Sequence, residues 1–164
     1  MIPNPIIKVL STLSCHEVQH LLMGGQACVF YGAAEFSRDC DIVIVADDEN
    51  LARLNSSLSA LQAECIAVPP FERQHLERGQ AVHFRCQHPD AARIRLDVMT
   101  RMRGCDSFVE MWERRLTLED AEGIVYEILG KEELSERNAD AAFWRPLRQE
   151  LEKLRFEKRI QAKE

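Results

Sequence analysis

Residues 24–44 read GGQACVFYGAAEFSRDCDIVI and form the most informative stretch of the chain. Gly24-Gly25 follows a short apolar run at 18–23, so the glycine pair predicts a tight turn after a strand. The β-branched run at 41–45, which is bounded by two aspartates, predicts a buried strand. Residues 26–34 between them look like a short buried helix that the glycine turn opens. The stretch therefore predicts a strand, a turn, a helix and a second strand in succession.

Carboxylates gather at the start of the second of these strands. Side chains alternate along a strand, so Asp39 and Asp41 point to one face, roughly 6.5–7 Å apart along the backbone, and Cys40 points to the opposite, packed face. Asp97 lies in another predicted strand, at 94–99, which we expect to neighbour the first. Oxygen ligands of this kind suit Mg²⁺ or Mn²⁺ better than zinc. Three carboxylates on two adjacent strands predict a two-metal site for in-line phosphoryl displacement, with the ions about 3.5–4 Å apart.

The rest of the chain predicts further helices and strands. Asn4-Pro5 offers a helix cap followed by proline, and Ser107 with Glu110 forms a capping box. The predicted helices are 5–15, 51–61, one that starts after Ser107, 131–143 and 146–161, and the further strands are 65–68, 81–86 and 124–129. We therefore expect an α/β (α+β) fold in which a short mixed β-sheet is flanked by helices. It would form a domain at 1–130, with a helical C-terminal extension at 131–164 packing on it.

Composition narrows the class of protein. The chain has 164 residues, 46% hydrophobic and 29% charged, which excludes wholesale disorder and fibrous classes. Its net charge of −6 argues against binding to nucleic acid through overall positive charge. No apolar run approaches the roughly 18 residues that a bilayer span needs, so no membrane association is expected. Six cysteines without a CxxC pair, and no sign of a secretory signal, indicate reduced, mostly buried thiols in a cytoplasmic protein.

The residues quoted above carry a resemblance to a known family. Met23, Gly24-Gly25, a gap of thirteen residues and then Asp39-Cys40-Asp41-Ile42 resemble the signature of the DNA polymerase β-like nucleotidyltransferase superfamily. Within it, Gly24-Gly25-Gln26-Ala27 and Tyr31-Gly32 are similar to small bacterial members related to the AbiE toxin group and to the minimal nucleotidyltransferases. The resemblance covers about residues 18–100, continues more weakly over 124–134, and implies the nucleotidyltransferase fold.

The resemblance also implies an activity and a set of site residues. A member of this family would use Mg²⁺ or Mn²⁺ to transfer a nucleoside monophosphate from a nucleoside triphosphate, such as ATP, to a hydroxyl acceptor. Asp39 and Asp41 would bind both metal ions, and Asp97 would complete one metal site and help to activate the acceptor hydroxyl. The phosphates would meet Gly24, Gly25, Ser37 and Arg38. The acceptor stays open between an RNA end, a protein hydroxyl and a small molecule, and a partner protein or a second copy of the chain could complete its site.

Two departures from the family pattern keep a second function open. Glu35 stands where many relatives carry an arginine. Residues 132–137 are mostly acidic where relatives carry basic nucleotide contacts, so Lys131 and Arg137 are the candidates there. The alternative is a protein of the same fold with little turnover that acts in binding or regulation, for example as a component of a toxin–antitoxin pair.

Other motifs have competing interpretations. Residues 16–20 read HEVQH and match the HExxH pattern of zinc proteases, which requires a continuous helix with both histidines on one face. The helical signal weakens near residue 15, so a zinc hydrolase is a minor alternative. Histidines 75, 83 and 88 are most simply surface or loop residues. Arginines 93, 95, 101 and 103 surround Asp97 and form either a positive rim for phosphates or a polynucleotide, or ordinary solvated charge.

Overall fold

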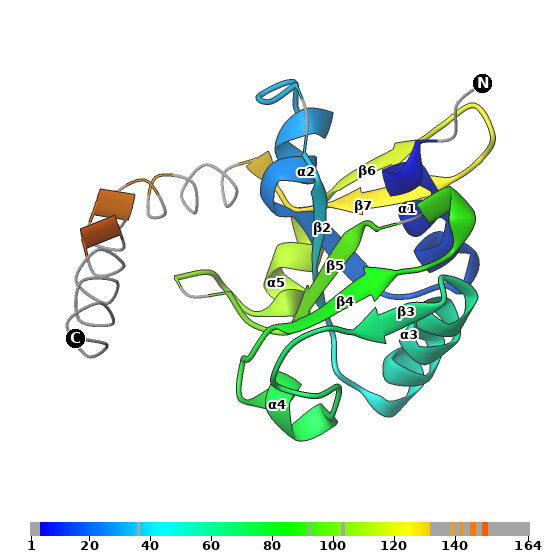
Figure 1. Cartoon of the computed structure of the whole chain (residues 1–164). Helices are drawn as coiled ribbons and strands as arrows, with labels where there is room; N and C mark the ends of the chain where they lie inside the picture. Colours follow the sequence, from blue (N-terminus) through cyan, green and yellow to red (C-terminus); the bar gives the residue numbers. More distant parts are fainter. Residues whose placement is uncertain are drawn as a thin grey trace, which may run out of the picture. The chain divides into compact units, whose positions relative to one another are not determined.

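A computed structural model describes residues 4–35, 37–91, 93–102 and 104–131, together with the isolated positions 139, 142, 145, 146, 149 and 150. Met1–Leu134 form one compact unit and Ser135–Glu164 a second, and every element named below belongs to the first (Figure 1). The helices expected at 131–143 and 146–161, including Arg137, lie almost entirely outside the described residues. Their packing on the domain stays a prediction.

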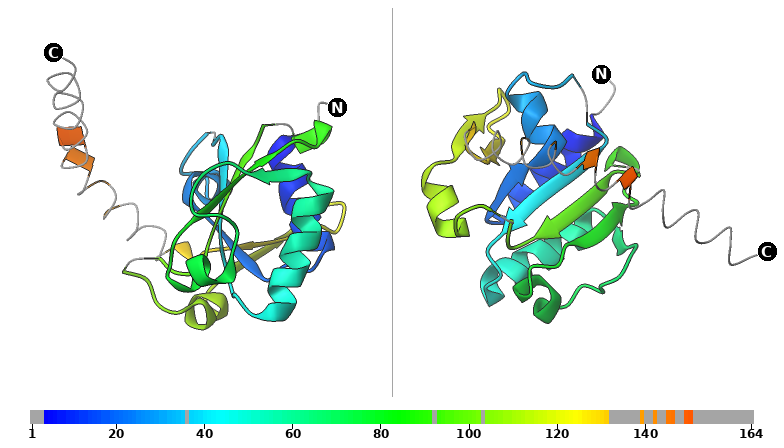
Figure 2. Two further views of the ribbon diagram at one scale, coloured as in Figure 1. Left: turned by 60° about the horizontal axis from the view of Figure 1, so that its bottom comes forward. Right: turned by 90° about the vertical axis from the view of Figure 1, so that its left-hand side faces the viewer.

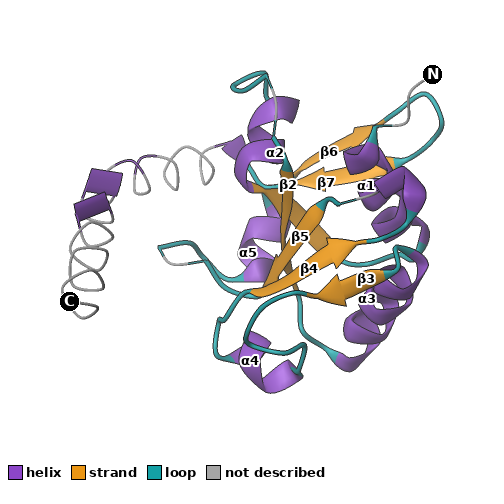
Figure 3. Cartoon of the chain, in the orientation of Figure 1, coloured by secondary structure: helices purple, strands orange, loops and turns teal. Residues whose placement is uncertain are grey.

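The first unit contains both helices and strands, which Figure 3 distinguishes by colour. The elements are α1 (Pro5–Cys15), β1 (His20–Met23), α2 (Gly24–Phe30), β2 (Asp39–Ile44), α3 (Asp48–Ala60), β3 (Ala63–Cys65), α4 (Arg73–Glu77), β4 (Val82–Cys86), the 3₁₀ turn η1 (Pro89–Ala91), β5 (Arg95–Met99), α5 (Phe108–Glu113), β6 (Leu116–Glu119) and β7 (Val125–Ile128). Of the helices in the described part of the chain, none is both long and apolar enough to span a bilayer.

One mixed sheet organises the unit. Its seven strands follow the order β3-β4-β5-β2-β1-β7-β6. The central strand β2 pairs in parallel with β5 and antiparallel with β1. This arrangement confirms the expected short mixed sheet flanked by helices, and it confirms that the strand of Asp97 neighbours the strand of Asp39 and Asp41.

The two faces of β2 have different environments. Cys40, Ile42 and Ile44 are completely buried, whereas Asp39 and Asp41 on the opposite face are partly exposed. Helices α1 and α3 lie side by side against one face of the sheet, as the two views of Figure 2 show. Val43, the next residue on the face of Asp39 and Asp41, is also completely buried, so the polar part of this face is confined to the start of β2.

Side-chain caps begin three of the helices where the sequence predicts them. The Asn4 side chain accepts a hydrogen bond of 3.0 Å from the backbone N–H of Ile6 at the start of α1. The Asp47 side chain caps α3 by accepting a hydrogen bond of 2.7 Å from the N–H of Asn50. The capping box of Ser107 with Glu110 is present at the start of α5. These short-range contacts satisfy backbone N–H groups that have no partner within the helix.

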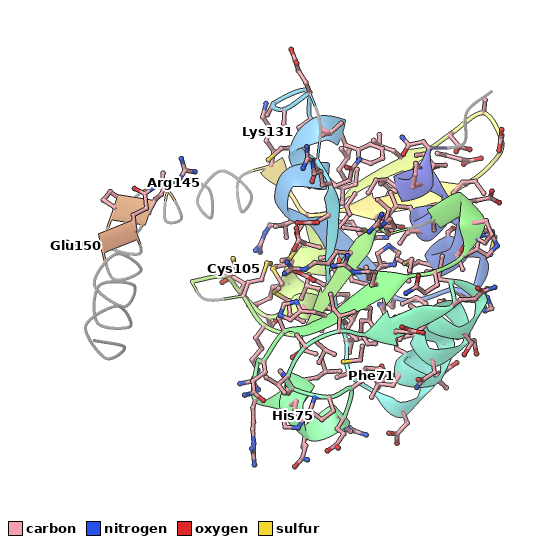
Figure 4. All side chains as sticks on the ribbon, viewed as in Figure 1. Phe71, His75, Cys105, Lys131, Arg145 and Glu150 are labelled. Atoms are coloured by element: carbon pink, nitrogen blue, oxygen red, sulfur yellow. The ribbon has the colours of Figure 1, made fainter. Side chains whose placement is uncertain are left out.

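Several element boundaries differ from the prediction. Helix α2 begins at the glycines themselves, and β2 begins at Asp39 rather than two residues later. Strand β3 covers residues 63–65 rather than 65–68, and the N–H of Ile66 just beyond it donates a hydrogen bond of 2.9 Å to the carbonyl of His83. Helix α4 and strand β6 were not predicted. The loop before α4 is held to β4 by Phe71, labelled in Figure 4, whose ring packs edge-on against Phe84 with centroids 5.2 Å apart.

The cysteines are less buried than expected. All six are free thiols, and Cys40 and Cys86 are buried as the prediction requires. Cys15 and Cys65 are exposed, so the expectation of mostly buried thiols is wrong for them. Their positions explain this result, because Cys15 is the last residue of α1 and Cys65 ends the edge strand β3.

Candidate active site

The three candidate carboxylates lie on two neighbouring strands. In the parallel pairing of β2 and β5, Asp41 stands opposite Asp97 and Asp39 stands opposite Arg95. Directly paired residues point to the same face of a sheet, so these four side chains share one polar face. The sheet thus brings together the Asp-Cys-Asp triplet and Asp97, which are more than fifty residues apart in the sequence.

Asp97 is buried and has close basic neighbours. Its side chain is 8% exposed. Both carboxylate oxygens accept hydrogen bonds from Arg95, Oδ1 from Nε at 2.7 Å and Oδ2 from Nη2 at 2.6 Å. His83 Nδ1 lies 2.8 Å from the same Oδ1. His83 belongs to β4, where the register places it opposite Asp97. Asp97 is therefore fixed from both sides by residues of its own strand and of the next one.

Gly24 packs closely against the Asp41 side chain. The backbone of Gly24 has a φ of +67°, and a Cβ placed there would lie 2.3 Å from Asp41 Oδ2. Only glycine combines this left-handed conformation with such a close approach. The turn between β1 and α2 therefore needs Gly24 in order to leave room for the Asp41 carboxylate.

The residues predicted to meet phosphates lie next to this turn. A Cβ on Gly25 would lie 2.8 Å from Ser37 Oγ. The Ser37 hydroxyl donates a hydrogen bond of 3.1 Å to the backbone carbonyl of Asp39. Ser37 and Arg38 both line a cavity of about 380 Å³. Its other polar lining residues are Asn4, Gln26, Glu35 and Arg93. The cavity is adjacent to the start of β2 and carries two arginines, so it can accept an anionic group.

Cys40 and Tyr31 are close in sequence to the site residues and have structural roles. Burial raises the pKa of the Cys40 thiol well above its ordinary range, so Cys40 stays neutral between the two aspartates. The Tyr31 hydroxyl donates a hydrogen bond of 2.8 Å to the carbonyl of Leu129, which ties the end of α2 to the segment after β7. The tyrosine of the Tyr31-Gly32 pair therefore has a structural contact that anchors the helix following the glycine turn.

Asp39 and Asp41 fit a divalent cation better than Asp97 does. Both lie on the open side of β2 and offer hard oxygen ligands of the type that Mg²⁺ and Mn²⁺ prefer. Both oxygens of Asp97 accept hydrogen bonds from Arg95, so a cation at Asp97 would compete with that guanidinium. No group of three or more His, Cys, Asp or Glu side chains in the described part of the chain is arranged to hold a metal ion.

Sequence reasoning missed His83 and misjudged Arg95. His83 is a strand residue on the polar face and touches Asp97, rather than a surface or loop histidine. The alternation of residues 82–86 was a signal for its face, but its partner depends on the register with β5. The three arginines that the structure describes have separate contacts: Arg93 lines the cavity, Arg95 holds Asp97 and Arg101 lies beside Gly79. Arg103 is outside the described residues.

The structure contradicts the zinc interpretation of HExxH. His16 is the residue that caps the end of α1, and Glu17 has a left-handed φ of 54°. His20 belongs to β1 and is only 4% exposed. The helix ends before the motif, so the two histidines cannot lie one turn apart on a common helical face.

The architecture is that of a nucleotidyltransferase fold. A solved structure from Thermotoga maritima, described as that of a "putative nucleotidyltransferase", superposes on this chain with a TM-score of 0.56. The match covers 91% of this chain and 89% of that one at 13% sequence identity, so the likeness concerns the fold. No protein-family model matches the sequence, and no curated protein matches it.

Proposed function

We propose that this protein is an Mg²⁺-dependent nucleotidyltransferase that transfers a nucleoside monophosphate from a nucleoside triphosphate to a hydroxyl acceptor. The observation that carries the proposal is the placement of Gly24 against Asp41, with Asp97 directly opposite on β5, within a nucleotidyltransferase fold. The glycine turn leaves room for one carboxylate beside a second, and such a pair suits a divalent cation to which a triphosphate binds.

Each residue of the polar face has a task in this reaction. Asp39 and Asp41 would hold the cation and Asp97 would complete its site, and a cation bound there would neutralise charge on the triphosphate. Ser37 and Arg38 line the adjacent cavity and would contact phosphate oxygens. The acceptor oxygen forms its bond to the α-phosphorus as the bond to pyrophosphate breaks, and the hydroxyl proton passes to Asp97. Catalysis of this kind depends on positioning and charge, which the strand register supplies.

Labelled nucleotides test the proposal. The purified chain is incubated with each α-labelled nucleoside triphosphate, Mg²⁺, and either total RNA or a protein extract, and transfer of label is measured. We expect transfer in the wild type and its loss in Asp39→Asn and Asp41→Asn. Asp48→Asn is the matched control, since Asp48 is an exposed carboxylate in the first turn of α3 that pairs with Arg73. Unchanged transfer in a folded Asp39→Asn variant would refute the assignment.

One observation favours a second candidate function. Both oxygens of Asp97 are engaged by Arg95, as they would be in a protein of this fold that turns over little and acts by binding, such as a toxin–antitoxin component. Thermal unfolding with Mg²⁺ and each nucleoside triphosphate separates the two functions. Metal-dependent stabilisation by a nucleotide supports the transferase, and no shift with any of them supports the binding protein.

A further inference from the structure

Arg95 holds the carboxylate that the proposed metal site would need. Its guanidinium makes a two-pronged contact with Asp97, with Nε 2.7 Å from Oδ1 and Nη2 2.6 Å from Oδ2. A fork of this kind takes one lone pair of each carboxylate oxygen in charge-assisted hydrogen bonds, and His83 Nδ1 lies 2.8 Å from Oδ1 as well. A divalent cation and this guanidinium therefore compete for the same two oxygen atoms.

The guanidinium also experiences the charge of the other two carboxylates. Its hydrogen bond to Asp97 is the main cause that raises the pKa of Arg95, and the negative charges of Asp39 and Asp41 raise it further. Arg95 stands opposite Asp39 in the strand register, one step along β5 from the Asp41–Asp97 pair. Arg95 thus places a positive charge beside the acidic face.

The two partners differ in how easily they can move. The Asp97 side chain is 8% exposed, whereas that of Arg95 is 41% exposed. The arginine can turn into water without leaving a buried cavity, while the carboxylate remains fixed between strands β4 and β2. Water can therefore solvate the guanidinium when a doubly charged cation displaces it from Asp97.

We propose that Arg95 is a displaceable counter-ion of the acidic site, which occupies Asp97 until a divalent cation takes its place and thereby lowers the affinity of the site for that cation. This inference rests on the proposed function, because it concerns the metal site assigned there. It assigns Arg95 a role as a positioning residue that acts on Asp97.

Mn²⁺ binding to the full chain tests the inference without any need for a substrate. Free Mn²⁺ is followed by its electron paramagnetic resonance signal in a titration at constant ionic strength. We expect Arg95→Gln to bind Mn²⁺ about tenfold more tightly than the wild type, which corresponds to about 1.4 kcal/mol. Arg95→Lys keeps the charge but cannot make the two-pronged contact, so we expect an affinity between those of the wild type and Arg95→Gln.

Arg85→Gln is the matched control for loss of charge. Arg85 lies on β4 opposite Arg95 and is not among the partners of Asp97 within the described residues. We expect this variant to change the affinity less than twofold. If Arg95→Gln binds no more tightly than Arg85→Gln, and Arg95→Lys matches the wild type, only general electrostatics is at work and the inference is wrong.

Asp39→Asn separates this inference from the proposed function. Equal Mn²⁺ binding by the wild type and all arginine variants, together with loss of binding in Asp39→Asn, would overturn the counter-ion role and leave the metal site standing. No Mn²⁺ binding by the wild type, Arg95→Gln or Arg95→Lys, each shown to be folded by its thermal transition, would overturn both.

Discussion

Substitution of Gly24 by alanine tests whether the glycine turn positions Asp41. At a φ of +67°, an alanine costs about 1–2 kcal/mol because its Cβ crowds the neighbouring carbonyl oxygen. The new Cβ would also lie 2.3 Å from Asp41 Oδ2 and 3.2 Å from Asp41 Cβ. Rotation of the carboxylate removes the first clash but not the second, because Cβ is fixed to strand β2. Forcing the side chain away from its rotamer adds roughly 0.5–1.5 kcal/mol.

Gly32→Ala is the control for the backbone cost alone. Gly32 has nearly the same φ, +70°, but a Cβ there would meet no atom within 4 Å. Both variants therefore lose about 1–2 kcal/mol of unfolding free energy through the left-handed backbone, and only Gly24→Ala loses the further amount. Urea unfolding measures both values, and the difference between the two variants isolates the contact with Asp41.

The same pair of variants makes a functional comparison. A displaced Asp41 carboxylate should weaken nucleotide transfer by about a hundredfold, the effect expected of a misplacement of about 1 Å at a reacting centre. Gly32→Ala should retain transfer close to that of the wild type. Equal stability loss and equal transfer in the two variants would show that the close approach of Gly24 to Asp41 has no functional consequence.

Two further predictions concern buried polar groups. Asn50 is 2% exposed, and its side-chain amide makes hydrogen bonds with the backbone of Gln19 and Val45. Asn50→Ala should therefore lower the free energy of unfolding in urea by about 3 kcal/mol. The control is Asn55→Ala, an exposed position, where the free energy of unfolding should hardly change. Burial lowers the pKa of His20 in the folded chain. As the pH drops below about 6.5, His20 is protonated in the unfolded chain before it is protonated in the folded one, so the free energy of unfolding should fall. Unfolding free energies at pH 7.5 and 5.5 check this, and an identical pH dependence in His20→Gln would contradict it.

The sequence contains enough information to locate the strand and the glycine turn of the site. The β-branched residues 42–45 and the flanking aspartates identify a buried strand, because both signals act over a few residues. Alternation alone places Asp39 and Asp41 on one face and Cys40 on the other, since it follows from the extended backbone itself. The helix caps at Asn4 and Ser107 were predictable for the same reason.

Elements with weak local signals were harder to predict. Leu116 and Leu118 alternate with polar residues, a pattern typical of a strand, but β6 has only four residues and depends on β7 for its pairing. Helix α4 has five residues and one buried side chain, Leu76. Such short segments are stable only in the context of the folded sheet, so their own residues carry little information about them.

The alternation of residues already shows which carboxylates share a face of β2, and the glycine pair already indicates a turn after β1. Only the tertiary structure decided that Asp41 stands opposite Asp97, that His83 reaches Asp97 from β4, and that Arg95 occupies both oxygens of that carboxylate. The physical reason lies in the range of the interactions. Alternation and capping arise between neighbours in the chain, whereas strand register is set by the packing of segments that are far apart in the sequence.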